Sequence, residues 1–336
     1  MPRFATATVT EILVERAGLQ RVDTDAGRAY VLTGLIGQVA VGDRVVLNTT
    51  AVDLGLGTGG WHVVHWNLAR DGWSQPGPGH IMKLRYTSLQ VDTGAAEETR
   101  PDLPEALDGL PVVACSLHSQ VAVVAAVVRH LRPTARIAYV MTDGAALPLA
   151  LSDLAHRLRE RGVVDITITA GHAFGGDLEA VSMPAALALA RHVAAADIAI
   201  VGMGPGVVGT ASSLGTTAVE VAAIADAAAA LGGRVAVCCR VSSADSRERH
   251  RGISHHVHTA LRLTCHRPEV PLPTGLAAGV DGAEPIDGPD AATVLAALGL
   301  DVTTMGRGPA EDPDFFAAAA SAGAWAAAAL VPQTPA

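Results

Sequence analysis

Blocks of apolar residues alternate with polar loops along the second half of the chain. Ala- and Leu-rich stretches of helical length separate five short, mainly apolar segments: Val112 to Ala114, Arg136 to Met141, Asp165 to Thr169, Asp197 to Gly202 and Arg234 to Arg240. Continuous apolar runs of this length are typical of strands that are buried on both faces of a parallel sheet. The pattern therefore predicts an α/β fold, with a Rossmann-like parallel sheet and helices on both of its faces.

A polar or glycine-rich loop follows each predicted strand. The loops read SLHSQ (116–120), TDGAALP (142–148), AGHAFGGD (170–177), MGPGVVGT (203–210) and SSADSRERHRGISHH (242–256). Because parallel strands point the same way, their loops meet at the carboxyl edge of the sheet, where doubly wound folds bind ligands. One site built from all five loops is therefore expected.

The first 70 residues have a different pattern, in which apolar and polar residues alternate over short stretches. Turn sequences such as Ala17-Gly18 and Val41-Gly42-Asp43 separate these stretches. They predict antiparallel strands, and a small β-barrel over 1–70 is the natural closure. The stretch VDLGLGTGG (52–60) is interpreted as a flexible connection, with a binding loop as the alternative. Few basic residues and no clear aromatic stacking surface argue against nucleic-acid binding by this barrel.

The content of Pro, Gly and Ala divides the rest of the chain into a linker and a second domain. Residues 71–110 predict a linker with one strand near Ile81 to Val91. Residues 111–336 form the predicted Rossmann-like domain. Its C-terminal part carries three predicted helices: Ser254 to about Thr264, and two Ala-rich helices near Asp290 to Leu298 and Pro313 to Leu330.

Composition narrows the classes of function. The 336 residues are 49% hydrophobic with a formal charge of -9, so a substantial core is expected and broad affinity for nucleic acids or anionic membranes is not. Four cysteines without a C-x-x-C pair argue against a zinc knuckle or a disulfide framework. The start lacks the pattern of a secretory signal, which favours the cytoplasm. The uncharged, Ala-rich residues 315–331 suit a packed helix or a homo-oligomer contact better than a membrane anchor.

The loop after the fourth predicted strand contains the sequence Gly204-Pro-Gly-Val-Val-Gly209. A dinucleotide-binding turn would lead directly into its helix, whereas a second run of small residues intervenes here, so the spacing argues against a dinucleotide site. The backbone N–H groups of such a loop suit an anion, with Gly204, Gly206, Gly209 and Thr210 as candidate binding residues. A tight structural turn is the alternative, and the sequence leaves both open.

The fifth loop is the most basic part of the chain. From Arg240 to Arg267 there are six arginines against Asp245 and Glu248, an excess of +4 in an acidic protein. This excess next to the glycine-rich loop predicts an anionic, phosphorylated small molecule as the ligand, with a solvated charged face as the alternative. The candidate ligand-binding residues outside the glycine-rich loop are Ser116, His118, Arg247, Arg249 and His256.

Histidines and aspartates in the same loops suggest a divalent metal ion as a cofactor. At about 100° per helical residue, His255, His256 and His258 point in separated directions, so at most two of them, such as 255 with 258, are expected to share an ion. Further ligands would come from His118, Asp143, Asp177 or His250. The predicted catalytic residues, as metal ligands or general bases, are Asp143, Asp177, His250 and His255. Neutral hydrogen-bonding histidines and turn-forming aspartates are the alternatives.

Taken in order, these loops and two stretches before them, VDLGLGTGG and GHIMKLRY, resemble the bacterial family called domain of unknown function 3866. The resemblance extends to about Pro273 and implies a bacterial protein of the kind found in actinobacteria and firmicutes. It implies no activity. The family pattern implies Gly at position 145 and Gln at position 172, where this chain has Ala145 and His172, and this difference argues against His172 as a required metal ligand.

These observations predict a cytoplasmic protein that binds an anionic, phosphorylated small molecule at the carboxyl edge of its sheet, as a metal-assisted hydrolase or transferase. A non-catalytic ligand sensor or scaffold is the main alternative. A nucleic-acid-associated protein that uses the barrel and the basic stretch 240–267 is a second, less favoured alternative.

Overall fold

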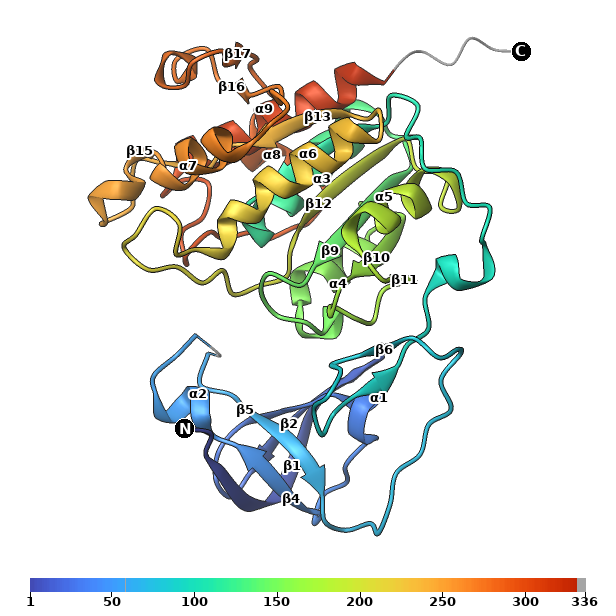
Figure 1. Ribbon diagram of the computed structural model, residues 1–336. Helices are drawn as coiled ribbons and strands as arrows, with labels where there is room; N and C mark the ends of the chain where they lie inside the picture. Colours follow the sequence, from blue (N-terminus) through green and yellow to red (C-terminus); the bar gives the residue numbers. More distant parts are fainter. Residues whose placement is uncertain (58, 331–336) are drawn as a thin grey trace. The chain divides into compact units, whose positions relative to one another are not determined.

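The computed structural model describes residues 1–57 and 59–330. The chain forms two compact units, unit 1 (Met1–Gly94) and unit 2 (Ala95–Ala336) (Figure 1). Unit 1 contains a β-barrel, and unit 2 is built on a parallel sheet.

The barrel of unit 1 is closed by five strands in the order β1-β2-β3-β5-β4. Alternate residues point inward, so that Val9, Val22 and Val45 form part of its core. The predicted barrel is confirmed, although one strand pair, β3 with β5, is parallel. This order with one parallel pair is that of the OB fold. The elements are β1 (Phe4–Arg16), β2 (Leu19–Thr24), β3 (Ala29–Val31), α1 (Thr33–Ile36), β4 (Arg44–Asn48), α2 (Thr50–Asp53) and β5 (His62–Asn67).

Two short strands follow the barrel in the chain, where the sequence predicts one strand. They are β6 (Met82–Lys83) and β7 (Val91–Asp92), and they pair antiparallel. The 3-10 helix η1 (Ala96–Thr99) comes next, at the beginning of unit 2.

The sheet of unit 2 has six parallel strands in the order β11-β10-β9-β12-β8-β13. They are β8 (Pro111–Cys115), β9 (Ile137–Thr142), β10 (Ile166–Ala170), β11 (Leu178–Ala180), β12 (Ile198–Met203) and β13 (Arg234–Cys238). All except β11 lie on the predicted segments. The three residues of β11 are too few to produce an apolar run, so sequence periodicity does not detect this strand.

Successive residues of these strands face opposite sides of the sheet, which produces two separate cores. Val113 and Tyr139 pack on the side of α3 (His118–Leu131), whereas Val112 and Val140 pack on the other side. In Figure 1, α5 and α6 lie in front of the sheet and α3 lies behind it. The predicted α/β fold with helices on both faces is confirmed. The remaining crossover helices are α4 (Asp153–Glu160), α5 (Met183–His192) and α6 (Glu220–Ala230).

Small elements follow β13. The helix α7 (His255–Leu263) begins after Ser254, whose side chain accepts a hydrogen bond from the His256 N–H, as expected of an N-cap. The other short strands are β14 (Val241–Ser242), β15 (Gly252–Ile253), β16 (Pro271–Leu272) and β17 (Glu284–Pro285). The 3-10 helices of unit 2 beyond η1 are η2 (Leu149–Leu151), η3 (Thr217–Val219), η4 (Glu248–His250) and η5 (Ala277–Gly279).

The two predicted Ala-rich helices are α8 (Ala291–Ala297) and α9 (Pro313–Ala329). Most residues of α9 are buried, and the helix packs against α3. A Cβ atom at Gly323 would lie 2.8 Å from the Cβ of Val127, so glycine permits this close approach of the helices. In the described parts of the chain, no helix has the length and apolar character that crossing a bilayer requires.

Candidate functional site

At the middle of the sheet, the connections between strands switch from one face of the sheet to the other. After β8 and β9 it crosses to the face covered by α3 and α4, whereas after β12, which lies between them, it crosses to the face covered by α6. The loops after these three strands therefore diverge at the carboxyl edge. Such a switch point is where α/β sheets bind their ligands.

Glu220, the first residue of α6, is a half-buried carboxylate at this switch point, and the sequence does not single it out. Its Oε1 accepts a hydrogen bond of 2.8 Å from Oγ1 of Thr142, at the end of β9. Burial, and to a smaller extent the charge of Asp143, raises the pKa of Glu220 to about 7. A Cβ at residue Gly144 would lie 2.6 Å from Oε2, so glycine leaves room for this carboxylate. The switch point thus carries a carboxyl group that can gain or lose a proton near neutral pH.

Asp143 lies beside Glu220, as its effect on the Glu220 pKa indicates. It also has a local role, because its Oδ2 accepts a hydrogen bond of 2.9 Å from the backbone N–H of His172. This bond joins the loops after β9 and β10. Asp143 therefore lies at the carboxyl edge and ties two of its loops together.

Asp177 lies at the opposite end of the strands. Its Oδ2 accepts hydrogen bonds from the N–H and Oγ1 of Thr167, at 2.8 and 2.9 Å, near the start of β10. Its Oδ1 pairs with Arg159 at 3.1 Å. The chain after β10 turns back along that strand in order to begin β11, and this return carries Asp177 away from the carboxyl edge. The structure does not bring Asp177 together with Asp143.

Ser116 and His118, after β8, bond to side chains inside unit 2. The N–H and Oγ of Ser116 donate to Oε1 of Gln120 at 2.9 and 3.2 Å. The His118 ring contacts the Tyr139 hydroxyl at 3.1 Å and Oγ of Ser152 at 2.6 Å. Burial lowers the pKa of His118 to about 4, so its ring is neutral at physiological pH. These contacts give His118 a positioning role at the edge of the sheet.

Some backbone N–H groups of the glycine-rich loop after β12 donate hydrogen bonds to nearby residues of the chain. The N–H of Thr210 donates to the Gly215 carbonyl at 2.6 Å, and that of Val208 donates to Oγ1 of Thr217 at 3.2 Å. A Cβ at Gly204 would lie 2.6 Å from the Ala146 carbonyl oxygen, whereas Gly206, with φ +101°, faces open space. The turn interpretation thus accounts for Gly204 and Thr210. Gly206 is the position of the predicted anion-binding turn with space around it.

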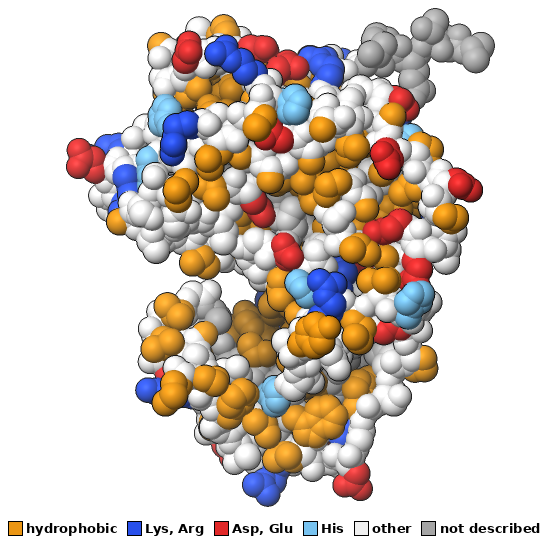
Figure 2. All heavy atoms as spheres, viewed as in Figure 1, with side chains coloured by type: hydrophobic (Ala, Val, Ile, Leu, Met, Phe, Trp, Pro, Cys, Tyr) orange, Lys and Arg blue, Asp and Glu red, His pale blue; other side chains and the backbone are white. Residues whose placement is uncertain are grey.

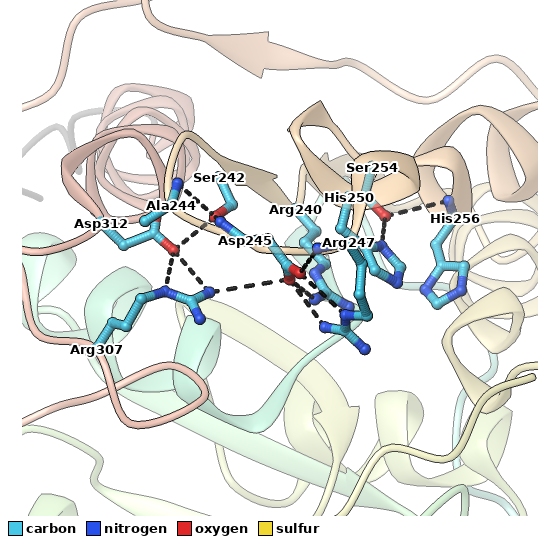
Figure 3. A network of polar contacts seen from close by, with 10 residues as sticks. All are labelled: Arg240, Ser242, Ala244, Asp245, Arg247, His250, Ser254, His256, Arg307 and Asp312. Carbon is cyan, nitrogen blue, oxygen red and sulfur yellow. Dashed lines mark hydrogen bonds and ion pairs between the residues drawn. The ribbon is translucent and has the colours of Figure 1, made fainter. Parts of the chain in front are cut away.

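Three histidines after β13 form a compact cluster, of which Figure 3 shows His250 and His256. His250 ends η4, and His255 and His256 begin α7. One possible ligand atom from each of them lies within 4.8 Å of the others, and the ring centroids of His255 and His256 are 4.3 Å apart. As expected, at most two of the three helical histidines belong to the cluster, but they are the adjacent His255 and His256, and the exposed His258, given as the example of a partner for His255, is not part of it. In the first turn of a helix no preceding turn hinders side chains from leaning toward the N-terminus.

The cluster contains nitrogen atoms that lack hydrogen-bond partners. Within residues 1–57 and 59–330, Nε2 of His255 and both ring nitrogens of His256 are buried without one. Nδ1 of His250 contacts Oγ of Ser254 at 2.8 Å. Burial is the main cause that lowers the pKa of His250 to about 3 and that of His256 to about 4. The rings are therefore neutral at physiological pH, as metal ligands must be.

A network of arginines and aspartates adjoins the histidine cluster (Figure 3). The buried Asp245 pairs with Arg240 at 3.0 Å and with Arg247 at 2.8 Å, and hydrogen bonds from Arg247 hold the pKa of this carboxyl well below its usual range. Arg307 links Asp245, at 3.9 Å, to Asp312, at 3.0 Å. Three guanidinium groups thus face two carboxylates, and the surplus positive charge suits an anion. Arg307 and Asp312 are far from the loop in sequence, which is why the sequence does not reveal them.

The basic residues of the fifth loop do not all belong to this cluster. Arg249 is exposed. Burial lowers the pKa of His255, and the charge of Arg249 is the second cause, which indicates that Arg249 lies near the histidines. Arg262 and Arg267 instead line a separate cavity of about 540 Å³ together with Glu269. In Figure 2, Lys, Arg and His side chains gather on the part of unit 2 where α7 lies in Figure 1.

The histidine cluster and the glycine-rich loop are neighbours. A Cβ at Gly209 would lie 3.7 Å from Cε1 of His256, and η3, directly before Glu220, packs against α7. The loops after β12 and β13 therefore form one candidate site, and Glu220 directly follows η3 at its side.

Comparison with known proteins identifies a family. The model of a family described as "Protein of unknown function (DUF3866)" matches residues 28–323. Neither the curated proteins nor the solved structures include a match to this chain.

Proposed function

Since the chain belongs to the DUF3866 family, whose description names no activity, we propose a function from the geometry of unit 2. His250, His255 and His256 bind a divalent transition metal, and the adjacent arginines bind an anionic, phosphorylated small molecule. The reaction is a metal-assisted hydrolysis or group transfer. The observation that carries the proposal is the set of buried imidazole nitrogens without hydrogen-bond partners, with ligand atoms within 4.8 Å of one another.

The donor set favours particular metals. Imidazole nitrogens suit zinc, copper, iron and nickel, whereas magnesium and calcium prefer oxygen ligands. Three histidines leave a fourth position of a tetrahedral zinc ion open for water or substrate. Zinc–nitrogen bonds of about 2.0 Å place the nitrogens about 3.3 Å apart. Closing the cluster around an ion therefore requires side-chain movements of about 1 Å.

Ser254 supports this arrangement. When Nδ1 of His250 donates to Oγ of Ser254, Nε2 of that ring is left as the metal ligand. Such a hydrogen bond from the other ring nitrogen orients a metal-binding imidazole and raises its basicity. Because Ser254 also caps α7, one side chain positions His250 and the helix that carries the other two histidines.

The arginines support an anionic ligand. A metal cation next to the surplus positive charge of Arg240, Arg247 and Arg307 is repelled unless an anion binds with it. A phosphoryl oxygen in the open coordination position would satisfy both the metal and the guanidinium groups. The ion would polarise that phosphoryl group or activate a water molecule. Glu220, with a pKa of about 7, is our candidate for a proton donor or acceptor in this reaction.

Cobalt(II) titration, followed by visible absorption, tests the metal site. We expect one ion per chain, and at least about tenfold weaker binding in His255→Ala and His256→Ala, because each variant loses a ligand. His258→Ala is the matched control, since His258 lies on the same helix but is exposed. Equal losses in all three variants, or no binding to the wild type, would contradict the metal site.

Activity is tested separately by measuring phosphate release from a panel of phosphomonoesters and nucleotides with zinc, cobalt or manganese. Turnover that needs the metal and falls in Glu220→Gln supports the enzyme. Metal-dependent binding of the same compounds without turnover instead supports the ligand-sensing alternative. Inorganic phosphate should tighten cobalt binding, and cobalt should tighten phosphate binding by the same factor, because the two equilibria are linked.

A further inference from the structure

The barrel of unit 1 carries a group of aromatic and basic side chains that the proposed function does not use. The rings of Tyr30 and Trp61 are stacked, with centroids 5.0 Å apart and planes at 20°. The guanidinium of Arg21 lies 5.5 Å from the Tyr30 centroid and 5.7 Å from the Trp61 centroid, and that of Arg28 lies 4.7 Å from Trp61. We call these four residues the stacking group. They come from β2, β3 and the two segments that precede β3 and β5.

The stacking group is outside the hydrophobic core of the barrel. Neither aromatic ring belongs to that core, and both are partly exposed, although Tyr30 lies between the core residues Ala29 and Val31. Arg21 is paired directly opposite Tyr30 in the β2–β3 ladder, which places both side chains on the outer face. A cation–π stack at an exposed site stabilises a protein by only about 0.5–1 kcal/mol. Packing within unit 1 therefore leaves this aromatic surface largely unexplained.

The backbone next to the stacking group is bare. A Cβ at Gly59 would lie 3.6 Å from Trp61, and one at Gly60 would lie 3.9 Å from Arg28, so glycine keeps these flanks free of side chains. Gly55 and Gly57, earlier in the same connection between β4 and β5, have nothing within 4 Å of a built Cβ. A ligand lying on the rings would thus meet backbone and not bulky side chains.

We infer that the stacking group binds single-stranded nucleic acid, with a base stacked on the Tyr30–Trp61 pair and phosphates contacted by Arg21 and Arg28. In OB barrels, the face of strands 2 and 3 and the loop between strands 4 and 5 bind oligonucleotides, and the stacking group lies on this face and at the end of this loop. Aromatic rings stack bases of any sequence, and arginines contribute both charge and planar stacking.

The charge distribution agrees with this ligand. Residues 1–94 carry eight basic and eight acidic side chains, so the formal charge of unit 1 is zero and the whole excess of -9 belongs to the rest of the chain. Acidity of the complete protein therefore does not argue against binding by the barrel. With two phosphate contacts, the logarithm of the binding constant should fall with the logarithm of salt concentration with a slope of about −1.4. Stacking, which salt does not screen, supplies the rest.

Fluorescence anisotropy of a labelled oligothymidylate of about 20 nucleotides, titrated with the full chain, tests the site. Trp61→Ala and Tyr30→Ala should each weaken binding by about tenfold or more, the effect of losing one stacked base. Phe4→Ala, at another exposed aromatic residue of the barrel, should change binding less than about twofold. Trp61→Phe, which keeps a ring, should retain most of the affinity even if the alanine variants are poorly folded.

Variants of the arginines and a comparison of single-stranded with duplex nucleic acid provide two further tests. Arg28→Ala should reduce the salt slope to about −0.7, since one contact is lost, whereas Arg44→Ala on β4 should leave it unchanged. A duplex of the same length should bind more weakly, because its bases are already stacked. Equal binding of single strand, duplex and heparin, normal binding by Trp61→Ala, or no binding by the wild type would each overturn the inference.

Discussion

Replacing Glu220 by Gln should remove a large part of the pH dependence of the stability of unit 2. The carboxyl group accepts a hydrogen bond from Thr142, and the amide oxygen of Gln can accept the same bond. The substitution therefore keeps the shape and the hydrogen bond but removes the ionisable group. Its effect isolates the protonation of Glu220.

The magnitude follows from the pKa. Burial, with Asp143 as a smaller cause, raises the pKa of Glu220 from 4.5 to about 7 in the folded protein. At about 1.4 kcal/mol per pH unit, the difference corresponds to at most about 3.5 kcal/mol, and we expect about 2 kcal/mol because the side chain is partly exposed. Since the folded protein holds this proton more tightly, the stabilisation is complete below pH 4.5 and is lost as the pH rises through 7.

Urea unfolding at several pH values between about 4.5 and 8, followed by far-ultraviolet circular dichroism, measures this effect. The long helices belong to unit 2, so the signal reports that unit. The free energy of unfolding of Glu220→Gln minus that of the wild type should rise by about 2 kcal/mol over this range. Glu160→Gln, at an exposed position of α4, controls for loss of a charge. Parallel curves for the wild type and Glu220→Gln would refute the reasoning.

Three further substitutions test neighbouring features. Asp143→Asn should lower the pKa of Glu220, visible as a downward shift of the same stability transition, because the charge of Asp143 helps to raise that pKa. Asp177→Ala should lower the free energy of unfolding by about 1–3 kcal/mol through two lost hydrogen bonds, yet leave cobalt binding unchanged. Gly204→Ala should lower the melting temperature, because its Cβ would lie 2.6 Å from the Ala146 carbonyl oxygen; an unchanged melting temperature would show that the loop adjusts freely.

The sheet could be predicted because its strands are buried on both faces and therefore appear as apolar runs. Helix boundaries also followed from local chemistry, since Ser254 caps α7 and Pro313 occupies the first position of α9. β11 was missed because three residues carry no periodic signal. That omission had a consequence for the site, because the chain returns to the amino end of β10 before β11 and takes Asp177 with it.

The parts of the candidate site differ in how far the sequence reveals them. His250, His255 and His256 lie within one segment, so their proximity was expected, but helical periodicity alone did not indicate that the adjacent residues 255 and 256 would be the two that cluster. Glu220 looks like any acidic residue at the start of a helix. Its burial and its contact with Thr142 depend on the chain's return to the middle of the sheet, and no local pattern encodes that return.

The stacking group shows the same limit in unit 1. Tyr30 and Trp61 are separated by about half of the barrel sequence, and a purely antiparallel arrangement of neighbouring strands does not bring them together. Their stacking depends on the parallel pairing of β3 with β5, in which Ala29 lies opposite His62. An aromatic surface built across non-consecutive strands is therefore absent from the sequence pattern. It appears only once the closing order of the barrel is known.

The two proposed sites require different charge distributions, and each unit has the distribution that its own site requires. In unit 2, Asp245 and Asp312 hold Arg240, Arg247 and Arg307 beside the histidine cluster, which forms a local positive site within a strongly acidic unit. Such a local site favours a small, highly charged ligand and disfavours a long polyanion. In unit 1, formal neutrality permits an extended chain, but stacking must supply most of the affinity. A phosphorylated metabolite and a nucleic-acid strand are thus expected to bind without competing.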